Sequence, residues 1–225
     1  MSQEQGLAGR LVGKMIHSNV KKRFHTVHWI PPCFAITPPA IFITNHHGWH
    51  DGYLMYHVVK ALKLPSLDWI QEFDSFPLFA KVGGMPYPAS DPQARAKTIR
   101  QTIRLMREES KSLILFAEGI LHPPHEILPI GKSLSLVARQ VPDATLIPTA
   151  IHYQQSLHER PEAFIAFAPP IPNTPNLLDD AHCSLTSLLQ TIRSAAQNPD
   201  HTTFKTLVQG THDINERMKP PTWIK

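Results

Sequence analysis

Short apolar stretches alternate with longer segments of helical periodicity along most of the chain, and this alternation constrains the fold more than any other feature. The clearest strands are Ala40–Thr44 and Ser112–Phe116, which are brief, apolar and rich in branched or aromatic side chains. Further strands are expected at Ser66–Ile70 and, with an interruption at Pro148, at residues 144–153. Strands that alternate with helices predict an α/β fold, a single domain with an αβα layered arrangement around a mixed sheet.

Caps and periodic apolar faces indicate where the helices lie. Asp91 and Pro92 are a typical N-cap and first helical residue, and the apolar pattern after them predicts a helix up to Glu109. The 225 residues fit one domain of ordinary size. The other expected elements are a short helix at 76–81, a weakly alternating edge strand at 163–168, and helices at 52–64, 131–140, 180–196 and 203–218.

The first 30 residues form a segment of their own character. Between residues 7 and 24, apolar side chains recur at the spacing of one helical face, and five cations lie among them. Such a basic amphipathic helix is interpreted in two ways, which the sequence leaves open. It either anchors the protein in a membrane interface, apolar face down, or packs on its own domain as an ordinary helix.

Composition limits the partners and the compartment. The net charge of +4 is mild, and no basic strand with interleaved aromatic residues occurs, so no nucleic-acid partner is expected. The two cysteines, Cys33 and Cys183, form neither a disulfide framework nor a CxxC pair and favour a reducing compartment. No run of 18 apolar residues predicts a membrane-spanning helix.

The stretch richest in chemistry follows the first of these strands directly, where residues 45–51 read Asn-His-His-Gly-Trp-His-Asp. Proteins of this class place reactive groups in such loops, outside the carboxyl end of a strand. A carboxylate at Asp51 would fix the tautomer of His46, whose other ring nitrogen then acts as a general base. The alternative is a metal-dependent hydrolase, in which the loop holds a divalent ion that activates water. Its ligands would be His46, His47, His50 and Asp51.

Four short blocks along the chain together resemble the glycerolipid and lysophospholipid acyltransferases. The first, Asn45-His46-x₄-Asp51, is similar to the family's NHx₄D block, which also follows an apolar strand. The other three, in order, are Val82-Gly83-Gly84-Met85, Phe116-Ala117-Glu118-Gly119, which is similar to Phe-Pro-Glu-Gly, and the proline-containing Leu146-Ile147-Pro148-Thr149-Ala150.

This resemblance implies transfer of a fatty acyl group from acyl-CoA or acyl-carrier protein to a hydroxyl of a lipid acceptor. His46 would be the catalytic general base and Asp51 would orient it. No metal and no organic cofactor is expected, because the thioester is already activated. The residues implied in substrate binding are Glu118, Gly119, Asn45, Gly84 and Pro148. Residues 31–225 would form the acyltransferase domain, preceded by the amphipathic helix within residues 1–30.

The chain departs from the family where the acceptor's phosphate is bound. The third block usually continues Thr-Arg, but Ile120 and Leu121 follow Gly119 here, and the second block also lacks its arginine. We therefore hypothesise an acceptor without a phosphate monoester, such as a neutral or glycosylated lipid alcohol, or a lysophospholipid. The residues that could replace the arginines as cations are Lys81, Lys132, His122 and His125.

Two further expectations concern membranes. Because long acyl chains and lipid acceptors reside in bilayers, the resemblance implies a peripheral protein at the cytoplasmic face of a membrane, with residues 7–24 as the candidate anchor. The missing arginines also leave open a catalytically degenerate, lipid-binding domain that keeps the acyltransferase fold.

Overall fold

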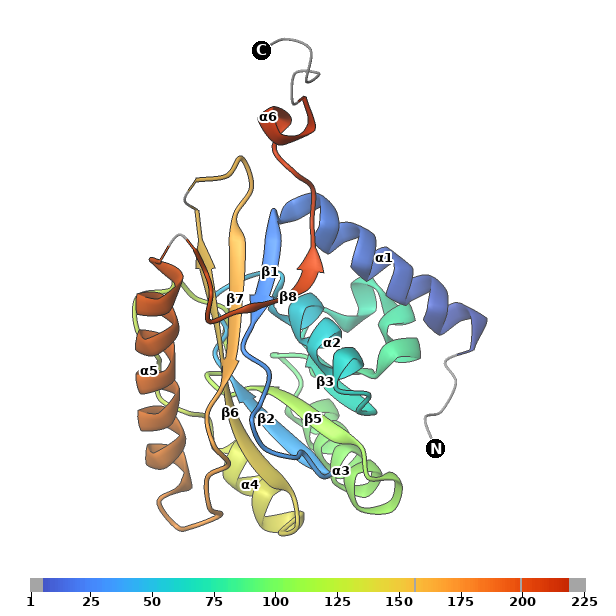
Figure 1. The fold of residues 1–225 in the computed structure, drawn as a ribbon. Helices are drawn as coiled ribbons and strands as arrows, with labels where there is room; N and C mark the ends of the chain where they lie inside the picture. Colours follow the sequence, from blue (N-terminus) through green and yellow to red (C-terminus); the bar gives the residue numbers. More distant parts are fainter. Residues whose placement is uncertain (1–5, 156, 199, 219–225) are drawn as a thin grey trace, which may run out of the picture.

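A computed structural model of the chain describes residues 6–155, 157–198 and 200–218. Within these ranges, eight strands form one mixed sheet that helices cover on both faces, which confirms the predicted αβα layered fold (Figure 1). The strands are β1 (Thr26–Trp29), β2 (Ala40–Thr44), β3 (Ser66–Ile70), β4 (Gly84–Pro86), β5 (Ser112–Phe116), β6 (Thr145–Gln154), β7 (Glu162–Phe167) and β8 (Lys205–Gln209). The helices are α1 (Leu7–Arg23), α2 (Asp51–Ala61), α3 (Pro92–Glu109), α4 (Ser133–Gln140), α5 (Leu177–Ala196) and α6 (Ile214–Arg217), with 3-10 turns η1 (Phe73–Ser75) and η2 (Pro77–Val82).

The sheet has the order β4-β3-β5-β2-β6-β7-β1-β8. The five strands from β4 to β6 are parallel, whereas β7 turns back antiparallel to β6. At the far edge, β1 runs parallel to β7 and β8 antiparallel to β1. The carboxyl ends of the five parallel strands therefore lie at the same end of the sheet. This is the end at which α/β folds bind ligands.

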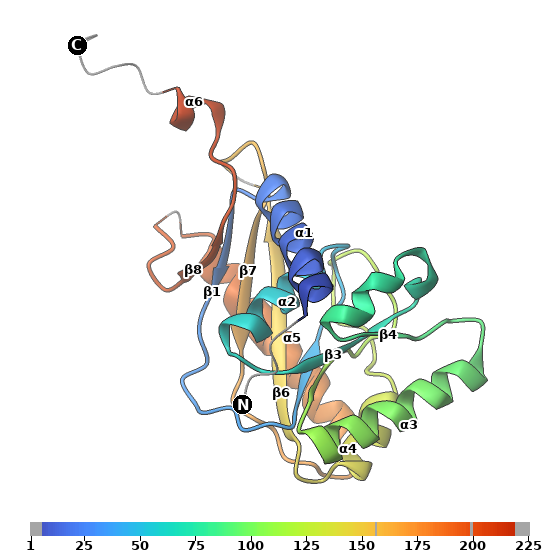
Figure 2. The same ribbon diagram turned by 90° about the vertical axis from the view of Figure 1, so that its right-hand side faces the viewer.

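Alternate residues of β2 belong to different layers, and this explains its unbroken apolar sequence. Ile41 and Ile43 pack into a core with residues of α3, α4 and α5, whereas Phe42 packs with α2 on the opposite face. All five residues of β2 are buried, as expected for a central parallel strand that is covered on both faces. Figure 2 shows α1 lying beside α2 on the same side of the sheet.

The amphipathic helix α1 divides its apolar residues between the domain and solvent. Val12, Ile16 and Val20 are buried, and the helix packs against α2 and η2. Leu7 and Leu11, which belong to the same predicted apolar face, are 82% and 67% exposed. Within the described part of the chain, no helix has both the length and the hydropathy required to cross a bilayer.

The predicted helix at 203–218 is wrong, because the segment forms β8 and the short helix α6. Residues 205–209 pair with β1, a strand that the sequence analysis does not predict. Between the two elements, a Cβ at Gly210 would lie 1.9 Å from the carbonyl oxygen of Phe24, so the close approach of these backbones requires glycine. The free edge of β1, nearly 180 residues earlier in the chain, thus decides the conformation of this segment.

Two other predictions of strand position are also wrong. The segment predicted as an edge strand is β7, an interior strand between β6 and β1, and its weak alternation reflects burial on both faces. Pro148 does not interrupt β6, which runs unbroken from Thr145 to Gln154. Pro148 precedes Thr149, where the paired register with β7 ends, and its carbonyl accepts the N–H of Ala168. A missing N–H is tolerated there because it falls at the end of that ladder.

The side chain of Asp68 in β3 is a buried carboxyl group that lies against α2. A Cβ at Gly52 of α2 would lie 3.2 Å from Asp68 Oδ2, and Asp68 Oδ1 is buried without a hydrogen-bond partner in the described structure. Burial raises the pKa of Asp68 to about 7, although a backbone hydrogen bond at Trp69 opposes the shift. Since the folded pKa exceeds the unfolded one, the folded protein binds the extra proton, and stability falls as pH rises from about 4 through 7.

We therefore expect Asp68→Asn to stabilise the protein at pH 8, by something on the order of 2 kcal/mol, and to have little effect near pH 4. Urea unfolding at both pH values measures the difference. Asp143→Asn, at an exposed position, is the matched control for the same chemical change outside the buried site. Equal effects of Asp68→Asn at pH 4 and pH 8 would contradict the shifted pKa.

Candidate active site

The loop between β2 and α2 is clamped to the sheet by Asn45. This fully buried residue follows β2 directly, and its amide makes two bonds to the backbone of Ile151 in β6. Asn45 Nδ2 donates to the Ile151 carbonyl at 2.9 Å, and Asn45 Oδ1 accepts the Ile151 N–H at 2.8 Å. Both ends of the amide are therefore used to fix the start of the loop, and the contact of Asn45 with substrate stays a prediction.

His46 and Asp51 form the predicted pair. His46 lies just beyond the carboxyl end of β2, Asp51 is the first residue of α2, and His46 Nδ1 lies 2.9 Å from Asp51 Oδ2. The carboxylate is completely buried, whereas the imidazole is 24% exposed. A carboxylate can only accept, so Nδ1 carries the proton and Nε2 has its lone pair free. This is the tautomer that a general base requires.

Three donors hold the Asp51 carboxylate. Besides the imidazole, the N–H of Gly48 donates to Asp51 Oδ2 at 2.9 Å, and the hydroxyl of Tyr153 donates a short bond to Asp51 Oδ1. Burial and the charge of Asp51 raise the pKa of Tyr153 well above its ordinary range, so the phenol stays protonated as a donor. A Cβ at Gly48 would lie 2.3 Å from the Tyr153 ring, which explains the glycine in the loop.

The ring of His46 is also held from the neighbouring strand β5. Phe116, the last residue of β5, stacks on it with ring centroids 4.4 Å apart and planes inclined by 24°. The imidazole thus has one nitrogen fixed by a carboxylate and one ring face covered by a phenyl group. Such a fixed ring presents the same nitrogen to a bound hydroxyl at every turnover.

Glu118 joins the two loops that leave β2 and β5. Its side chain is buried and accepts the backbone N–H of His46 at 2.8 Å. The backbone N–H of Leu128 and His122 Nε2 also donate to this carboxylate, each at 2.6 Å, and His47 Nε2 lies 3.7 Å away, within the distance of an ion pair but beyond that of a hydrogen bond. Burial alone would raise the pKa of Glu118, but these donors outweigh it and lower the pKa to about 2. The ionised carboxylate is therefore a hub that sets the position of His46.

The structure brings together only some of the predicted substrate-binding residues. Gly119 adjoins the pair through Glu118, and its left-handed backbone (φ of +77°) turns the loop towards β3, where Gln71 donates to its carbonyl. Gly84 begins β4, three strands from β2 in the sheet, and its Cα packs closely against Phe79. Pro148 is paired beside Ile43 inside the sheet. Neither Gly84 nor Pro148 contacts His46 through any hydrogen bond of the described structure.

The histidines of the loop have separate partners, which does not favour the hydrolase alternative. His46 bonds Asp51, His47 lies beside Glu118, and His50 bonds Asn19 of α1 at 3.1 Å. In the described ranges, the groups with the spacing of metal ligands include His47, Glu118 and His122 but not the set of His46, His47, His50 and Asp51. Both oxygens of Glu118 already accept backbone N–H groups, as expected for a structural hub.

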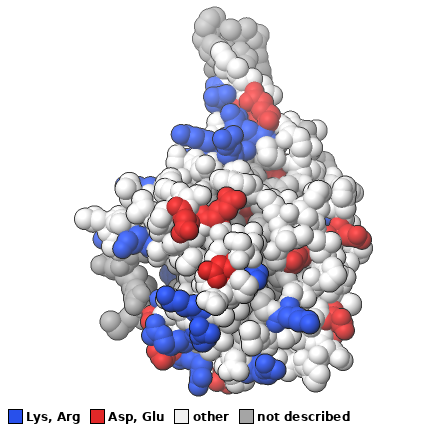
Figure 3. All heavy atoms as spheres, turned by 180° about the vertical axis from the view of Figure 1, so that it is seen from behind, with Lys and Arg blue, Asp and Glu red and all other residues white. Residues whose placement is uncertain are grey.

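Two of the cations considered as substitutes for the missing arginines, His122 and Lys132, are already bonded or lie elsewhere. His122 spends one ring nitrogen on Glu118 and the other on the carbonyl of Pro123. Lys132 lines a cavity of about 560 Å³ against Ile99 of α3 and Leu178 of α5, on the face of the sheet away from α2. Seen from behind, Lys and Arg side chains also gather over α3 (Figure 3). By contrast, Ile120 and Leu121, next to the pair, are about half exposed.

Comparison with known proteins identifies the family of this chain. Residues 19–152 match the model of the Acyltransferase family, which is more than half of the chain. The chain belongs to the acyltransferase family. A comparison with curated proteins finds no match.

Several solved protein chains match this fold. One of them is the crystal structure of the 1-acyl-sn-glycerophosphate (LPA) acyltransferase PlsC from Thermotoga maritima, with a TM-score of 0.56 and 13% sequence identity. The match covers 83% of this chain and 77% of that chain. At this identity the likeness concerns the fold alone, and it confirms the architecture predicted from the sequence.

Tyr153 is the site residue that the sequence analysis of this acyltransferase missed. It lies three residues beyond the fourth block, near the end of β6, and comes to Asp51 only because β6 is the neighbour of β2. The signal available in the sequence was weak, namely a tyrosine that follows a motif strand. Its hydroxyl donates to the carboxylate that in turn bonds His46, which is the position of a residue that orients rather than reacts.

We expect Tyr153→Phe to lower kcat about tenfold with KM little changed, because a hydrogen bond to a charged group is lost while the ring keeps its packing. Steady-state kinetics and thermal unfolding measure both effects. Tyr87→Phe, which leaves a ring stacked on Trp69 away from the pair, should leave kcat unaltered. A Tyr153→Phe enzyme with normal kcat would remove Tyr153 from the site.

Proposed function

We propose that the protein transfers a fatty acyl group from a thioester donor, acyl-CoA or acyl-carrier protein, to a hydroxyl of a lipid acceptor. The observation that carries the proposal is the bond between His46 and the buried Asp51, in a member of the acyltransferase family. The pair leaves one imidazole nitrogen as a proton acceptor, at the edge of the sheet where substrates bind in such folds.

The resemblance to the glycerolipid acyltransferases implies the course of the reaction, and the bond between His46 and Asp51 supports it. His46 Nε2 takes the proton of the acceptor hydroxyl, and the oxygen attacks the thioester carbonyl directly, without an acyl-enzyme. The C–O bond forms, the C–S bond breaks, and the imidazolium returns the proton to the leaving thiolate. Asp51 stabilises the imidazolium meanwhile. The chemical step requires no metal or organic cofactor, because the thioester supplies an activated acyl group.

The oxyanion of the tetrahedral intermediate needs donors, and two nearby N–H groups are already spent. The N–H of His46 binds Glu118 and that of Gly48 binds Asp51. Donors for the oxyanion must therefore come from other groups at the mouth of the site. The loop is instead built to hold the base.

The surface beside the pair supports an acceptor without a phosphate monoester. Where the family has an arginine for the phosphate, Ile120 and Leu121 present partly exposed apolar side chains. A phosphate at this point would lose hydration without gaining a bidentate partner, whereas an uncharged lipid alcohol would lose little. The specific lysophosphatidate-type activity of related enzymes is thus the less favoured variant of this proposal.

The decisive test is a thiol-release assay with acyl-CoA, acyl-carrier protein and a panel of lipid acceptors. We expect His46→Ala to lower kcat by about 10²–10⁴ while the protein remains folded at the assay temperature, as its thermal unfolding curve would show. The matched control is His125→Ala, at an exposed position that lines a hollow with His182 and Arg193 of α5, and it should keep full activity.

Two outcomes would contradict the proposal. Unchanged turnover in His46→Ala would favour the degenerate lipid-binding interpretation, and activity on lysophosphatidate above that on any uncharged acceptor would overturn the acceptor assignment.

We further propose that the enzyme works as a peripheral protein at the cytoplasmic face of a membrane. Six of the ten large hydrophobic side chains that are exposed in the described structure belong to segments around the pair. They are Leu7 and Leu11 of α1, Trp49 of the loop, Leu78 of η2, and Ile120 and Leu121. The bond between His50 and Asn19 ties α1 to the loop, and Lys14 and Lys21 add exposed cations for lipid phosphates.

Free Cys33 and Cys183 agree with a reducing compartment.

We expect the double variant Leu11→Glu/Trp49→Glu to bind vesicles of phosphatidylcholine with an anionic phospholipid at least tenfold more weakly, since each side chain contributes about 1.5–3 kcal/mol on burial. Sedimentation with vesicles measures this, and wild-type binding should weaken with added salt. Leu136→Glu, on the exposed face of α4, should bind normally. Undiminished binding by the double variant would assign membrane contact to another surface.

A further inference from the structure

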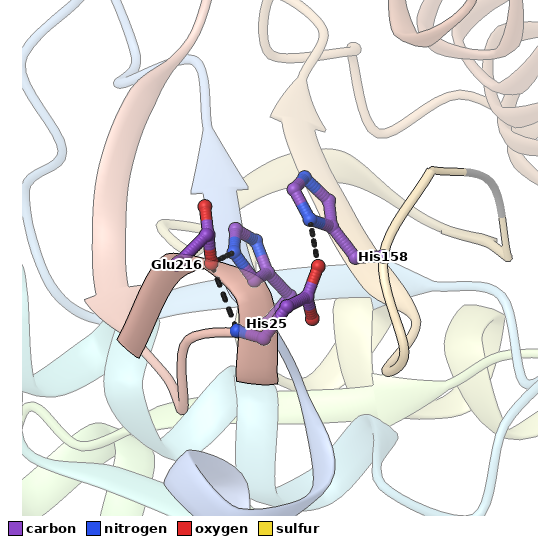
Figure 4. A group of neighbouring side chains, drawn as sticks. His25, His158 and Glu216 are labelled. Atoms are coloured by element: carbon purple, nitrogen blue, oxygen red, sulfur yellow. Dashed lines mark hydrogen bonds and ion pairs between the residues drawn. The ribbon is translucent and has the colours of Figure 1, made fainter. Parts of the chain in front are cut away.

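Two histidines and two carboxylates converge beside the edge of the sheet that β1 and β8 form. They are His25 just before β1, His158 between β6 and β7, and Asp213 and Glu216 of the C-terminal segment (Figure 4). The strands β6 and β7 separate this end from β2, so the cluster is distinct from the pair at His46. The acyl-transfer chemistry does not use it.

The ligand atoms lie at the spacing of a small metal ion. His25 Nε2 is 3.0 Å from Glu216 Oε2, and His158 Nδ1 is 2.7 Å from Asp213 Oδ2. One ligand atom from each of the four residues lies within 4.8 Å of all the others. Ligands about 2.0–2.1 Å from a tetrahedral Zn²⁺ are themselves about 3.3 Å apart. Modest side-chain movement therefore brings the four atoms around one ion.

The surroundings hold these groups as outer-sphere partners hold metal ligands. The second nitrogen of His25, Nδ1, lies 3.1 Å from Thr26 Oγ1, and the second oxygen of Asp213 accepts the N–H of Glu159 at 3.0 Å. His25 and Asp213 are buried, and the rings of His25 and His158 are stacked 3.4 Å apart. Bonds of this kind fix the orientation of a ligand before the ion arrives.

The donor set selects the class of ion. Two imidazole nitrogens and two carboxylate oxygens suit Zn²⁺ and neighbouring transition metals, whereas Ca²⁺ and Mg²⁺ prefer oxygen alone. The two carboxylates neutralise the charge of a divalent ion. With four protein ligands such a site is closed, which is typical of a structural metal and leaves no position for water.

We propose that His25, His158, Asp213 and Glu216 form a structural site for a divalent transition-metal ion of the Zn²⁺ type. The ion would fasten the C-terminal segment of β8 and α6 to β1 and the β6–β7 connection. Asp213 and Glu216 also form the capping box of α6, so the same two side chains begin the helix and join it to the sheet. The sequence analysis expected no metal, and it sought one only in the loop at His46.

A second group nearby must be distinguished from this site. Glu162 lies 2.8 Å from His28 Nε2 and 3.5 Å from His201 Nε2, and also 4.0 Å from His25 Nδ1. The group of His28, Glu162 and His201 offers three ligands, one fewer than the proposed site. His201→Gln is therefore the matched control for loss of the proposed site.

The test uses the full chain without a polyhistidine tag, dialysed against a chelator and titrated with ZnCl₂ by calorimetry. We expect binding of one ion to the four-ligand site and a higher thermal midpoint with Zn²⁺, because the ion binds only the folded chain. His158→Gln should weaken binding at least tenfold, whereas His201→Gln should retain it. Zinc affinity that survives in His158→Gln and disappears in His201→Gln would overturn the assignment.

Cobalt substitution keeps the proposal testable if a variant folds poorly. Co²⁺ in a tetrahedral site has visible absorption bands, and His158→Cys should add the near-ultraviolet band of a thiolate ligand. If the wild-type protein binds neither Zn²⁺ nor Co²⁺ at 100-fold molar excess, the metal site is refuted. The cluster would then hold the C-terminal segment by hydrogen bonds alone.

Discussion

The arrangement of the site depends on one buried carboxylate, that of Asp51. It begins α2 and accepts bonds from the loop, from the imidazole of His46 and from Tyr153 of β6. An ionised group without solvent is costly unless such donors surround it, so its charge forces the loop, the helix and the strand into one geometry. The same bonds that stabilise the charge also hold His46 in the orientation that the proposed base requires.

Glu118 serves the neighbouring strand in a similar way. Glu118 lies in the loop after β5, just as Asp51 lies after β2. Its bond to the N–H of His46 joins the loops that follow these two parallel strands. The site thus consists of two carboxylates that are both saturated with donors, one of which touches the imidazole ring and the other its backbone. Holding the base from both sides restricts its motion, which is what proximity catalysis requires.

Histidines are frequent in this chain, 14 of 225 residues, yet they do different things in different places. His46 is oriented and partly exposed, as a proton acceptor must be. His25 and His158 lie in a carboxylate cluster at the far edge of the sheet. Residue type alone does not separate these roles, because the separation comes from which carboxylate the fold brings to each ring.

Local chemistry in the sequence determined much of this protein. Buried strands such as Ala40–Thr44 and Ser112–Phe116, the cap at Asp91, and the pairing of His46 with Asp51 five residues later all follow from short-range periodicity and spacing. What depends on distant partners was decided only by the tertiary structure. Residues 203–218 have a helical sequence pattern, but residues 205–209 form a strand because they pair with β1. Tyr153 reaches Asp51 because β6 lies beside β2. The four ligands of the proposed metal site come together from positions almost 200 residues apart in the chain. Hydrogen bonds between neighbours in space leave no trace in the spacing of residues along the chain, and for that reason the sequence could not show them.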